Sequence, residues 1–291
     1  MKPFAIFSLI LLFSLTALAE ENSILVTAQW VKDHQSDPNV VLVQINFLKL
    51  DYDAEHIAGA RYLWPGSLAP DSPLGAMNEP DLKIAQDILE GMGISNDNHV
   101  VLYFVRNEVS PTSRIFLTLE NLGMRGKVSV MDGGLEAWKK AGFPLTQEVP
   151  QARRGKFKPA SLGYLVDKNY VLKNLNSNST VIVDARMKRF YDGESTGNPR
   201  DGHIAGAKNI PYTDMVDQNN FFKPVDQLQG YFTPVADNRN KEIVTYCFIG
   251  QTASVVYLAG RILGYNMKLY DGSMQEWSRI KELPMEVTEK K

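Results

Sequence analysis

The feature of the sequence that most constrains its fold is an internal repeat. Short phrases occur twice and in the same order: HIAGA at 56–60 and 203–207, VLVQIN at 41–46 echoed by VIVDAR at 181–186, and MDGGLEAW at 131–138 echoed by YDGSMQEW at 270–277. Because the spacing between the phrases drifts only by loop-sized amounts, the repeat indicates a duplicated domain. The hinge between the copies is expected near Glu148–Ala160, which is rich in charge and proline.

Each copy alternates short apolar runs with segments of helical period. The runs that we expect to be buried parallel strands are rich in valine and isoleucine: Val40–Ile45, Val100–Phe104, Val128–Met131, Val181–Val183, Ile243–Tyr246 and Met267–Tyr270. Helices are expected at Asp81–Leu89, Thr112–Leu122 and Thr252–Leu263. Strands and helices joined by short links imply right-handed crossovers. The sequence therefore predicts an α/β fold of two tandem domains, each a parallel sheet flanked by helices: a first domain (23–147), a linker (148–160) and a second domain (161–291).

The first 19 residues have the pattern of a secretory signal peptide. A single cation, Lys2, precedes an apolar run that ends in the small-x-small triplet Ala17–Ala19. The run is shorter than the ~20 apolar residues that a membrane-spanning helix needs, and serine and threonine interrupt it. We therefore expect cleavage after Ala19 and a secreted or periplasmic protein that has no membrane association afterwards.

Composition limits the classes of partner. With 44% hydrophobic and 22% charged residues, the chain is typical of a globular protein with a buried core. A formal net charge of −2 gives no reason to expect nucleic acid or an anionic membrane as a partner. The four histidines and the one cysteine match no metal-ligand spacing, so neither a metal nor another cofactor is expected.

Cys247 is the only cysteine of the chain. Since it cannot form an internal disulfide, it is a buried packing residue, an intermolecular partner or a reactive group. It lies between a predicted strand and a predicted helix, and ligand sites in open parallel sheets lie at the carboxyl ends of strands. A loop of this kind points backbone N–H groups and a helix N-terminus at its centre, which favours a thiolate. Gly250 is placed for a positive φ, and Thr252 is placed to cap the helix.

The segment CFIGQT at 247–252, together with GHIAGA, VDAR and YDGSMQEW, resembles the rhodanese sulfurtransferases. The likeness is to their tandem form, in which only the second domain carries the cysteine. It implies a ping-pong reaction in which Cys247 takes a sulfane sulfur from a small donor, such as thiosulfate, a persulfide or a polysulfide. Cyanide, a thiol or a protein sulfur acceptor would then receive that sulfur. The resemblance also implies that the persulfide is stabilised by the amides of Phe248, Ile249, Gly250, Gln251 and Thr252.

Two basic residues near the predicted site have competing interpretations. The resemblance makes Arg186, at the end of its predicted strand, an anion-binding residue, and the alternative is an ion pair with Asp184 or Asp192. We favour the anion-binding role. Arg189 is one residue away from the position of a second arginine in the family, so a solvated surface position is an equal alternative.

His203 is a tempting base for Cys247. However, its repeat partner His56 lies in the domain that has no thiol, so both histidines are expected to fix a turn through ring hydrogen bonds. Aligning Tyr103 with Tyr246 puts Phe104 at the position of the cysteine. The first domain is therefore expected to be a structural partner without activity.

The loop sequence also bears on the donor and on the alternatives. Relatives that prefer thiosulfate often have cations after the cysteine, and relatives that prefer mercaptopyruvate have Gly-Ser. This chain has Phe248-Ile249, so we expect thiosulfate to be a poor donor and a hydrophobic or polysulfide-like donor to be preferred. A dual-specificity phosphatase is disfavoured because Ala253 stands where its arginine would be. The main alternative is an exported sulfur-carrier or binding module without turnover.

Overall fold

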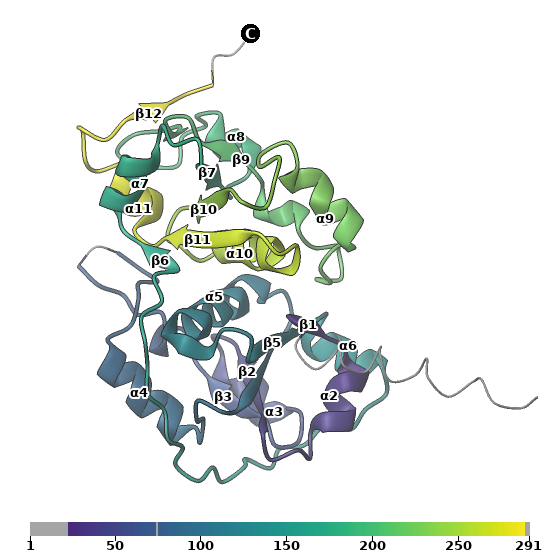
Figure 1. Cartoon of the computed structure of the whole chain (residues 1–291). Helices are drawn as coiled ribbons and strands as arrows, with labels where there is room; N and C mark the ends of the chain where they lie inside the picture. Colours follow the sequence, from purple (N-terminus) through teal and green to yellow (C-terminus); the bar gives the residue numbers. More distant parts are fainter. Residues whose placement is uncertain (1–22, 74, 289–291) are drawn as a thin grey trace, which may run out of the picture.

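The computed structural model describes residues 23–73 and 75–288, so the expected signal peptide (1–19) lies outside the described residues. The chain forms two α/β domains, which lie one above the other in Figure 1. Each contains a five-stranded sheet, with the orders β1-β5-β4-β2-β3 and β6-β11-β10-β7-β9. All strand pairs within these two sheets are parallel. The predicted fold of two tandem parallel sheets flanked by helices is confirmed.

The elements of the first domain begin with the edge strand of its sheet and end with the helix of the MDGGLEAW phrase. In chain order they are β1 (Leu25–Val26), α2 (Ala28–His34), β2 (Val40–Ile45), α3 (Lys49–Ala54), β3 (Arg61–Leu63), η1 (Pro65–Ser67), α4 (Leu82–Gly91), β4 (His99–Phe104), α5 (Val109–Leu119), the π-helical turn η2 (Glu120–Met124), β5 (Val128–Met131) and α6 (Gly134–Lys140).

The second domain follows the same order, with two additional short strands, β8 (His203–Ile204) and β12 (Met285–Glu286), and without a counterpart of η2 among its described residues. Its elements are β6 (Leu165–Val166), α7 (Lys168–Asn174), β7 (Thr180–Asp184), α8 (Lys188–Tyr191), β8, β9 (Lys208–Asn209), η3 (Tyr212–Asp214), α9 (Val225–Phe232), β10 (Glu242–Tyr246), α10 (Ala253–Ile262), β11 (Asn266–Tyr270), α11 (Ser273–Trp277) and β12. Each of the predicted strands is present and agrees with the structure to within one residue at either end. The predicted helix at Thr112–Leu122 instead begins at Val109.

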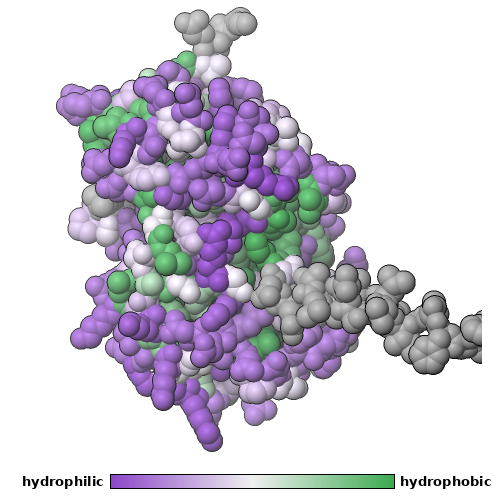
Figure 2. Space-filling view, viewed as in Figure 1, coloured by the Kyte–Doolittle hydropathy of each residue, from purple (hydrophilic) through white to green (hydrophobic). Residues whose placement is uncertain are grey.

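The two domains meet through equivalent helices. The helix that follows the central strand of the first sheet, α5, packs against α10, which follows the central strand of the second sheet (Figure 1). Almost every residue of both helices is buried, and one apolar cluster runs from the first sheet through this contact to the second. Figure 2 shows hydrophilic residues over most of the visible face, with apolar residues gathered beside the domain boundary. The duplication therefore creates an interface at which the start of one helix lies near the start of the other.

Residues 148–160, the expected linker, form neither helix nor strand and lie against the first domain. Phe157 is buried, and Arg154 forms ion pairs with Asp87 and Glu90 on α4. These contacts hold the segment on the surface of α4. None of the helices within residues 23–73 and 75–288 has the length and apolar character needed to cross a bilayer.

Candidate active site

Cys247 directly follows β10, the central strand of the second sheet, as the sequence predicted. Its side chain is buried, with 1% of the residue exposed. The Cys247 N–H donates to Ser273 Oγ at 3.2 Å, and the Cys247 carbonyl accepts from the N–H of Met274 at 3.0 Å. The helix α11 thus fixes the backbone of the cysteine at the carboxyl edge of the sheet.

The residues after Cys247 form a loop whose amides are free. Within the described part of the chain, the N–H groups of residues 248–252 have no hydrogen-bond partner. The loop turns at Gly250, which has φ +80°. A Cβ at that position would lie 3.0 Å from Nη1 of Arg114 and 3.1 Å from the carbonyl oxygen of Asp271, so the predicted need for glycine is confirmed.

The prediction that Thr252 caps the following helix is wrong. Thr252 precedes α10, but its side chain makes no capping hydrogen bond. Its φ of −70° and ψ of −25° are already helical, whereas a capping side chain needs an extended backbone to reach the first free N–H groups. The hydroxyl of Ser254 instead donates to the carbonyl of Gln251 at 2.5 Å.

Arg186 lies close to the loop, and two of its three guanidinium nitrogens are engaged in hydrogen bonds. Its Nε donates to both carboxylate oxygens of Asp184, at 3.0 and 3.1 Å, and its Nη2 donates at 2.6 Å. Nη2 also donates to the carbonyl of Gly202 at 2.7 Å. The ion pair with Asp184, the alternative to the anion-binding role, is therefore what the structure contains. Both side chains are buried, and the guanidinium carbon lies 5.0 Å from the ring centre of Phe248.

The first domain has a neutral version of this pair. Gln44 and Asn46 take the two positions, and Gln44 Nε2 donates to Asn46 Oδ1 at 3.1 Å. Tyr103 donates to Gln44 at 2.9 Å and aligns with Tyr246, because each tyrosine hydroxyl accepts the N–H of the isoleucine in its HIAGA phrase. This match puts Phe104, at the end of β4, in the position of the cysteine.

His203 forms the kind of ring hydrogen bond that the repeat predicted. Its Nδ1–H donates to the carbonyl of Tyr191 at 2.7 Å, and its ring stacks on that tyrosine at 3.7 Å. His56 makes the same two contacts with Tyr52, at 2.7 and 3.8 Å. The domain without a thiol has the same arrangement, which agrees with the expected role of the histidine in fixing a turn.

Aromatic side chains lie beside the loop. The rings of Phe190 and Phe248 meet edge to face with centres 5.3 Å apart, and both residues are partly exposed. Arg189 lies over Phe190 at 4.5 Å, and its side chain is 56% exposed with Glu194 at 3.7 Å. Arg189 is thus a surface residue at the edge of an apolar area that includes the half-buried Ile249.

The first domain also contacts the loop, which the sequence did not predict. Ser110 and Arg114, both on α5, bond to residues of the loop and of α10. The repeat phrases show which segments of the two domains are equivalent, but they do not show which residues of one domain face the other. The sequence therefore did not predict these contacts. Asp271 and Ser273, in contrast, lie in the phrase YDGSMQEW. Because this phrase belongs to the copy of the repeat that contains Cys247, the sequence could have indicated that these two residues contact the site.

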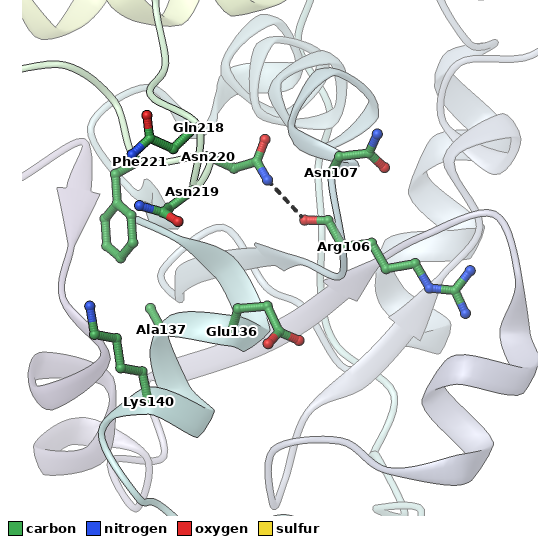
Figure 3. A pocket seen from close by; sticks show the side chains of 9 residues that line it. All are labelled: Arg106, Asn107, Glu136, Ala137, Lys140, Gln218, Asn219, Asn220 and Phe221. Carbon is green, nitrogen blue, oxygen red and sulfur yellow. Dashed lines mark hydrogen bonds between the residues drawn. The ribbon is translucent and has the colours of Figure 1, made fainter.

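A separate cavity of about 490 Å³ lies between the domains (Figure 3). The first domain contributes Arg106 and Glu136, and the second domain contributes the segment 218–221. The Asn220 amide donates to the Arg106 carbonyl at 3.4 Å, the contact drawn in Figure 3. Cys247 is not among its lining residues. Across the described residues, no group of three or more His, Cys, Asp or Glu could hold a metal ion.

Comparisons with known proteins agree with this geometry. A family model described as Rhodanese-like domain matches the chain twice, at residues 27–141 and 167–280. A sulfur carrier protein of Thermus thermophilus is 31% identical over 278 residues, which cover 90% of this chain and 96% of that protein. A 3-mercaptopyruvate sulfurtransferase of Escherichia coli is 31% identical over 277 residues, which cover 90% of this chain and 97% of the relative.

The fold has close counterparts among solved structures. The crystal structure of a 3-mercaptopyruvate sulfotransferase from Escherichia coli superimposes with a TM-score of 0.76 at 29% identity. The match covers 86% of this chain and 98% of that chain.

Proposed function

Because the chain belongs to the rhodanese family and is a sulfurtransferase, we propose that it moves a sulfane sulfur through a persulfide on Cys247. The observation that carries this proposal is the position of the only thiol. It lies at the carboxyl end of the central strand, directly before a loop of unpartnered N–H groups. Such a loop can stabilise the negative terminal sulfur of a persulfide.

The reaction has two halves. The Cys247 thiolate attacks the outer sulfur of a donor such as thiosulfate, the sulfur–sulfur bond of the donor breaks, and sulfite leaves with the electron pair. Cyanide or a thiolate then attacks the outer sulfur of the persulfide. With cyanide the products are thiocyanate and the regenerated Cys247 thiolate, so no external oxidant or reductant is needed.

The donor that fits the site best is apolar or polysulfide-like. Phe248 and Ile249 follow the cysteine, and Phe190 lies against Phe248. Two cations lie nearby, and each faces a carboxylate: Arg186 pairs with Asp184, and the exposed Arg189 lies 3.7 Å from Glu194. An anion with two charges therefore gains little electrostatic attraction here, which supports a poor reaction with thiosulfate. A lower KM for thiosulfate than for every persulfide or polysulfide donor tested would overturn this preference.

A second function, sulfur carriage without rapid turnover, is favoured by one observation. A relative that is 31% identical across 90% of this chain is a sulfur carrier protein. A carrier and a catalyst need the same loop, so only kinetics separates them. Rapid turnover with small acceptors would support the enzyme, and loading without turnover would support the carrier.

We also propose that residues 1–19 are removed after Ala19 and that the protein is exported. The apolar run and the small-x-small triplet support this proposal. Expression of the full chain followed by N-terminal sequencing of the periplasmic and secreted fractions tests it. An intact Met1 in a cytoplasmic fraction alone would contradict it.

Intact-protein mass spectrometry tests the persulfide. The mature chain is treated with thiosulfate or polysulfide beside a Cys247→Ser control. We expect the wild type alone to gain one sulfur and to lose it on addition of cyanide or a thiol. No gain with any donor would overturn the proposed function while leaving the fold unchanged.

A further inference from the structure

The first domain holds the active-site loop with one face of α5. Ser110 Oγ accepts a hydrogen bond from Gln251 Nε2 at 3.1 Å, and the Ser110 carbonyl oxygen lies 3.2 Å from Ser254 Oγ, whose single hydrogen it shares with the nearer carbonyl of Gln251. One helical turn later, Arg114 Nη1 donates to the carbonyl of Gly250 at 3.4 Å. The domain without a thiol is therefore in direct contact with the loop that follows Cys247 and with the first turn of α10.

Arg114 is an unusual residue for an ordinary packing role. It is fully buried, and its Nη1 lies 2.7 Å from a carboxylate oxygen of Asp271 in an ion pair. Its Nε and Nη2 atoms have no hydrogen-bond partner among the described residues. A buried cation with unused donors opposes folding, so the docking of the two domains does not by itself explain an arginine here.

The contacts of the loop carbonyls determine where the loop N–H groups point. In a planar trans peptide the C=O of one residue and the N–H of the next point in opposite directions, and the chain contains no cis peptide among its described residues. Four carbonyls after β10 accept hydrogen bonds from protein groups: Cys247 from Met274, Phe248 from Gln275, Gly250 from Arg114 and Gln251 from Ser254. The N–H groups of Phe248, Ile249, Gln251 and Thr252 must therefore turn away from those groups, where they remain free for a ligand.

The peptide between Gly250 and Gln251 is the least restrained of these. Gly250 has φ +80°, in a region that only glycine enters readily, and glycine can also leave it easily. The other carbonyl anchors come from the second domain itself, on α11 and α10. Arg114 is the anchor that the first domain supplies.

We infer that Arg114 is a positioning residue for sulfur transfer, which orients the Gly250–Gln251 peptide and so aims the Gln251 N–H at the persulfide. The inference rests on the proposed function for its purpose and on the contacts above for its geometry. It assigns the first domain a role in catalysis although that domain has no thiol. The effect passes through the backbone, since Asp271 already balances the charge of Arg114.

The test compares Arg114→Met with Arg114→Lys. We expect Arg114→Met to slow persulfide formation about tenfold, less than the loss of an entire oxyanion-hole donor, with the donor KM within about twofold. Arg114→Lys keeps one donor and should recover most of the rate. Because Cys247 is the only cysteine, its thiolate absorbance can be followed against pH without any sulfur donor, with Cys247→Ser as the blank. The Arg114→Met profile should move to higher pH by about half a unit or more.

The matched control is Arg261→Met. Arg261 lies on α10 in the same helix pair, but it pairs with Glu120 at the other end of the contact, away from the loop. We expect it to lower the melting temperature and leave both the rate and the thiolate profile unchanged. Equal loss of rate in Arg114→Met and Arg261→Met, or a lower melting temperature alone in Arg114→Met, would overturn the inference.

Two further outcomes are distinguishable. If Arg114→Met does not fold, Arg114→Lys and the charge-free pair Arg114→Met with Asp271→Asn carry the same comparison. A wild-type protein that gains no sulfur by mass spectrometry refutes the proposed function. In that case the thiolate absorbance, measured against pH, still decides whether Arg114 orients the loop. An unchanged thiolate profile and an unchanged rate in all of these variants would refute the inference alone.

Discussion

Phe248 lies between two side chains of opposite character. The guanidinium of Arg186 is 5.0 Å from its ring centre, and the ring of Phe190 is 5.3 Å away on the apolar side. Because Asp184 neutralises Arg186, an anion that reaches the loop meets an aromatic ring and a balanced ion pair. The side chain at this position should therefore decide how well an anionic donor competes with an apolar one.

Replacing this ring with a cation should change the donor preference. We expect Phe248→Lys to raise kcat/KM for thiosulfate about fivefold to tenfold, the effect of one partly exposed charge pair, and to lower it for a hydrophobic persulfide donor. Steady-state kinetics with both donors measures the ratio. Phe248→Leu is the control, because it keeps the apolar character and should leave the ratio within about twofold. An equal rise of kcat/KM for thiosulfate in Phe248→Leu would mean that the smaller side chain, and not the added charge, causes the effect.

At the scale of elements, the segment from Val216 to Phe222 reaches from the second domain onto the first. Its two ends form a bridge, and the N–H of Phe222 donates to Asp132 at 2.9 Å, directly after β5. The ring of Phe221 lies where a Cβ on Gly133 would be, so that glycine permits the close approach. Burial raises the pKa of Asp132 to about 6, opposed by two backbone N–H donors and assisted by the nearby Asp217.

This raised pKa predicts a pH dependence of stability. The folded protein holds the Asp132 proton more tightly than the unfolded chain, whose ordinary value is 3.8, so the contribution of this group is present at low pH. It is lost as the pH rises from about 4 to about 6. The amide introduced by Asp132→Asn can still accept the Phe222 N–H. We expect the free energy of unfolding of Asp132→Asn to be about 1–2 kcal/mol higher than that of the wild type above pH 7, after allowance for partial exposure, and equal to it near pH 4.

Urea unfolding at a series of pH values measures this difference. A matched control is Asp217→Asn, which removes the neighbouring charge and keeps the Asp132 carboxylate. Asp217→Asn should move the pH-dependent loss of stability to slightly lower pH without abolishing it. A difference between Asp132→Asn and the wild type that stays constant with pH would contradict the prediction.

The elements that sequence predicted well are those whose signal is local. The buried central strands follow from runs of valine and isoleucine, and the position of Cys247 follows from the strand that precedes it. The edge strands β1, β6 and β9 are too short to give such a signal. The ion pair of Arg186 with Asp184, two positions away, depends on side-chain direction, and the role of Thr252 depended on a backbone angle, so neither could be read from the sequence alone.

At the scale of the whole molecule, the sequence could not predict which residues make contact across the domain boundary. Glu120 lies just after α5 and is buried, and it accepts hydrogen bonds from Tyr257 at 2.8 Å and from Arg261 at 2.7 and 2.9 Å. The equivalent position in the second domain does not need a carboxylate, because α5 and α10 are two different copies of one helix and contribute different side chains to the interface. Because this network and an apolar cluster span both domains, we expect the two domains to unfold as one cooperative unit.

Glu120→Gln should therefore weaken the whole molecule and not one domain alone. It leaves the nearly buried Arg261 cation without its counter-charge, and breaking one partner of such a buried pair costs about 3 kcal/mol. We expect calorimetry to show one transition for the wild type, and for Glu120→Gln a lower melting temperature with a transition that broadens toward two. Lys49→Gln, which removes an exposed ion pair with Asp53, is the control and should change stability by less than about 0.5 kcal/mol. Equal effects of the two variants would mean that the domains are coupled by apolar packing of α5 on α10 and not by the buried carboxylate.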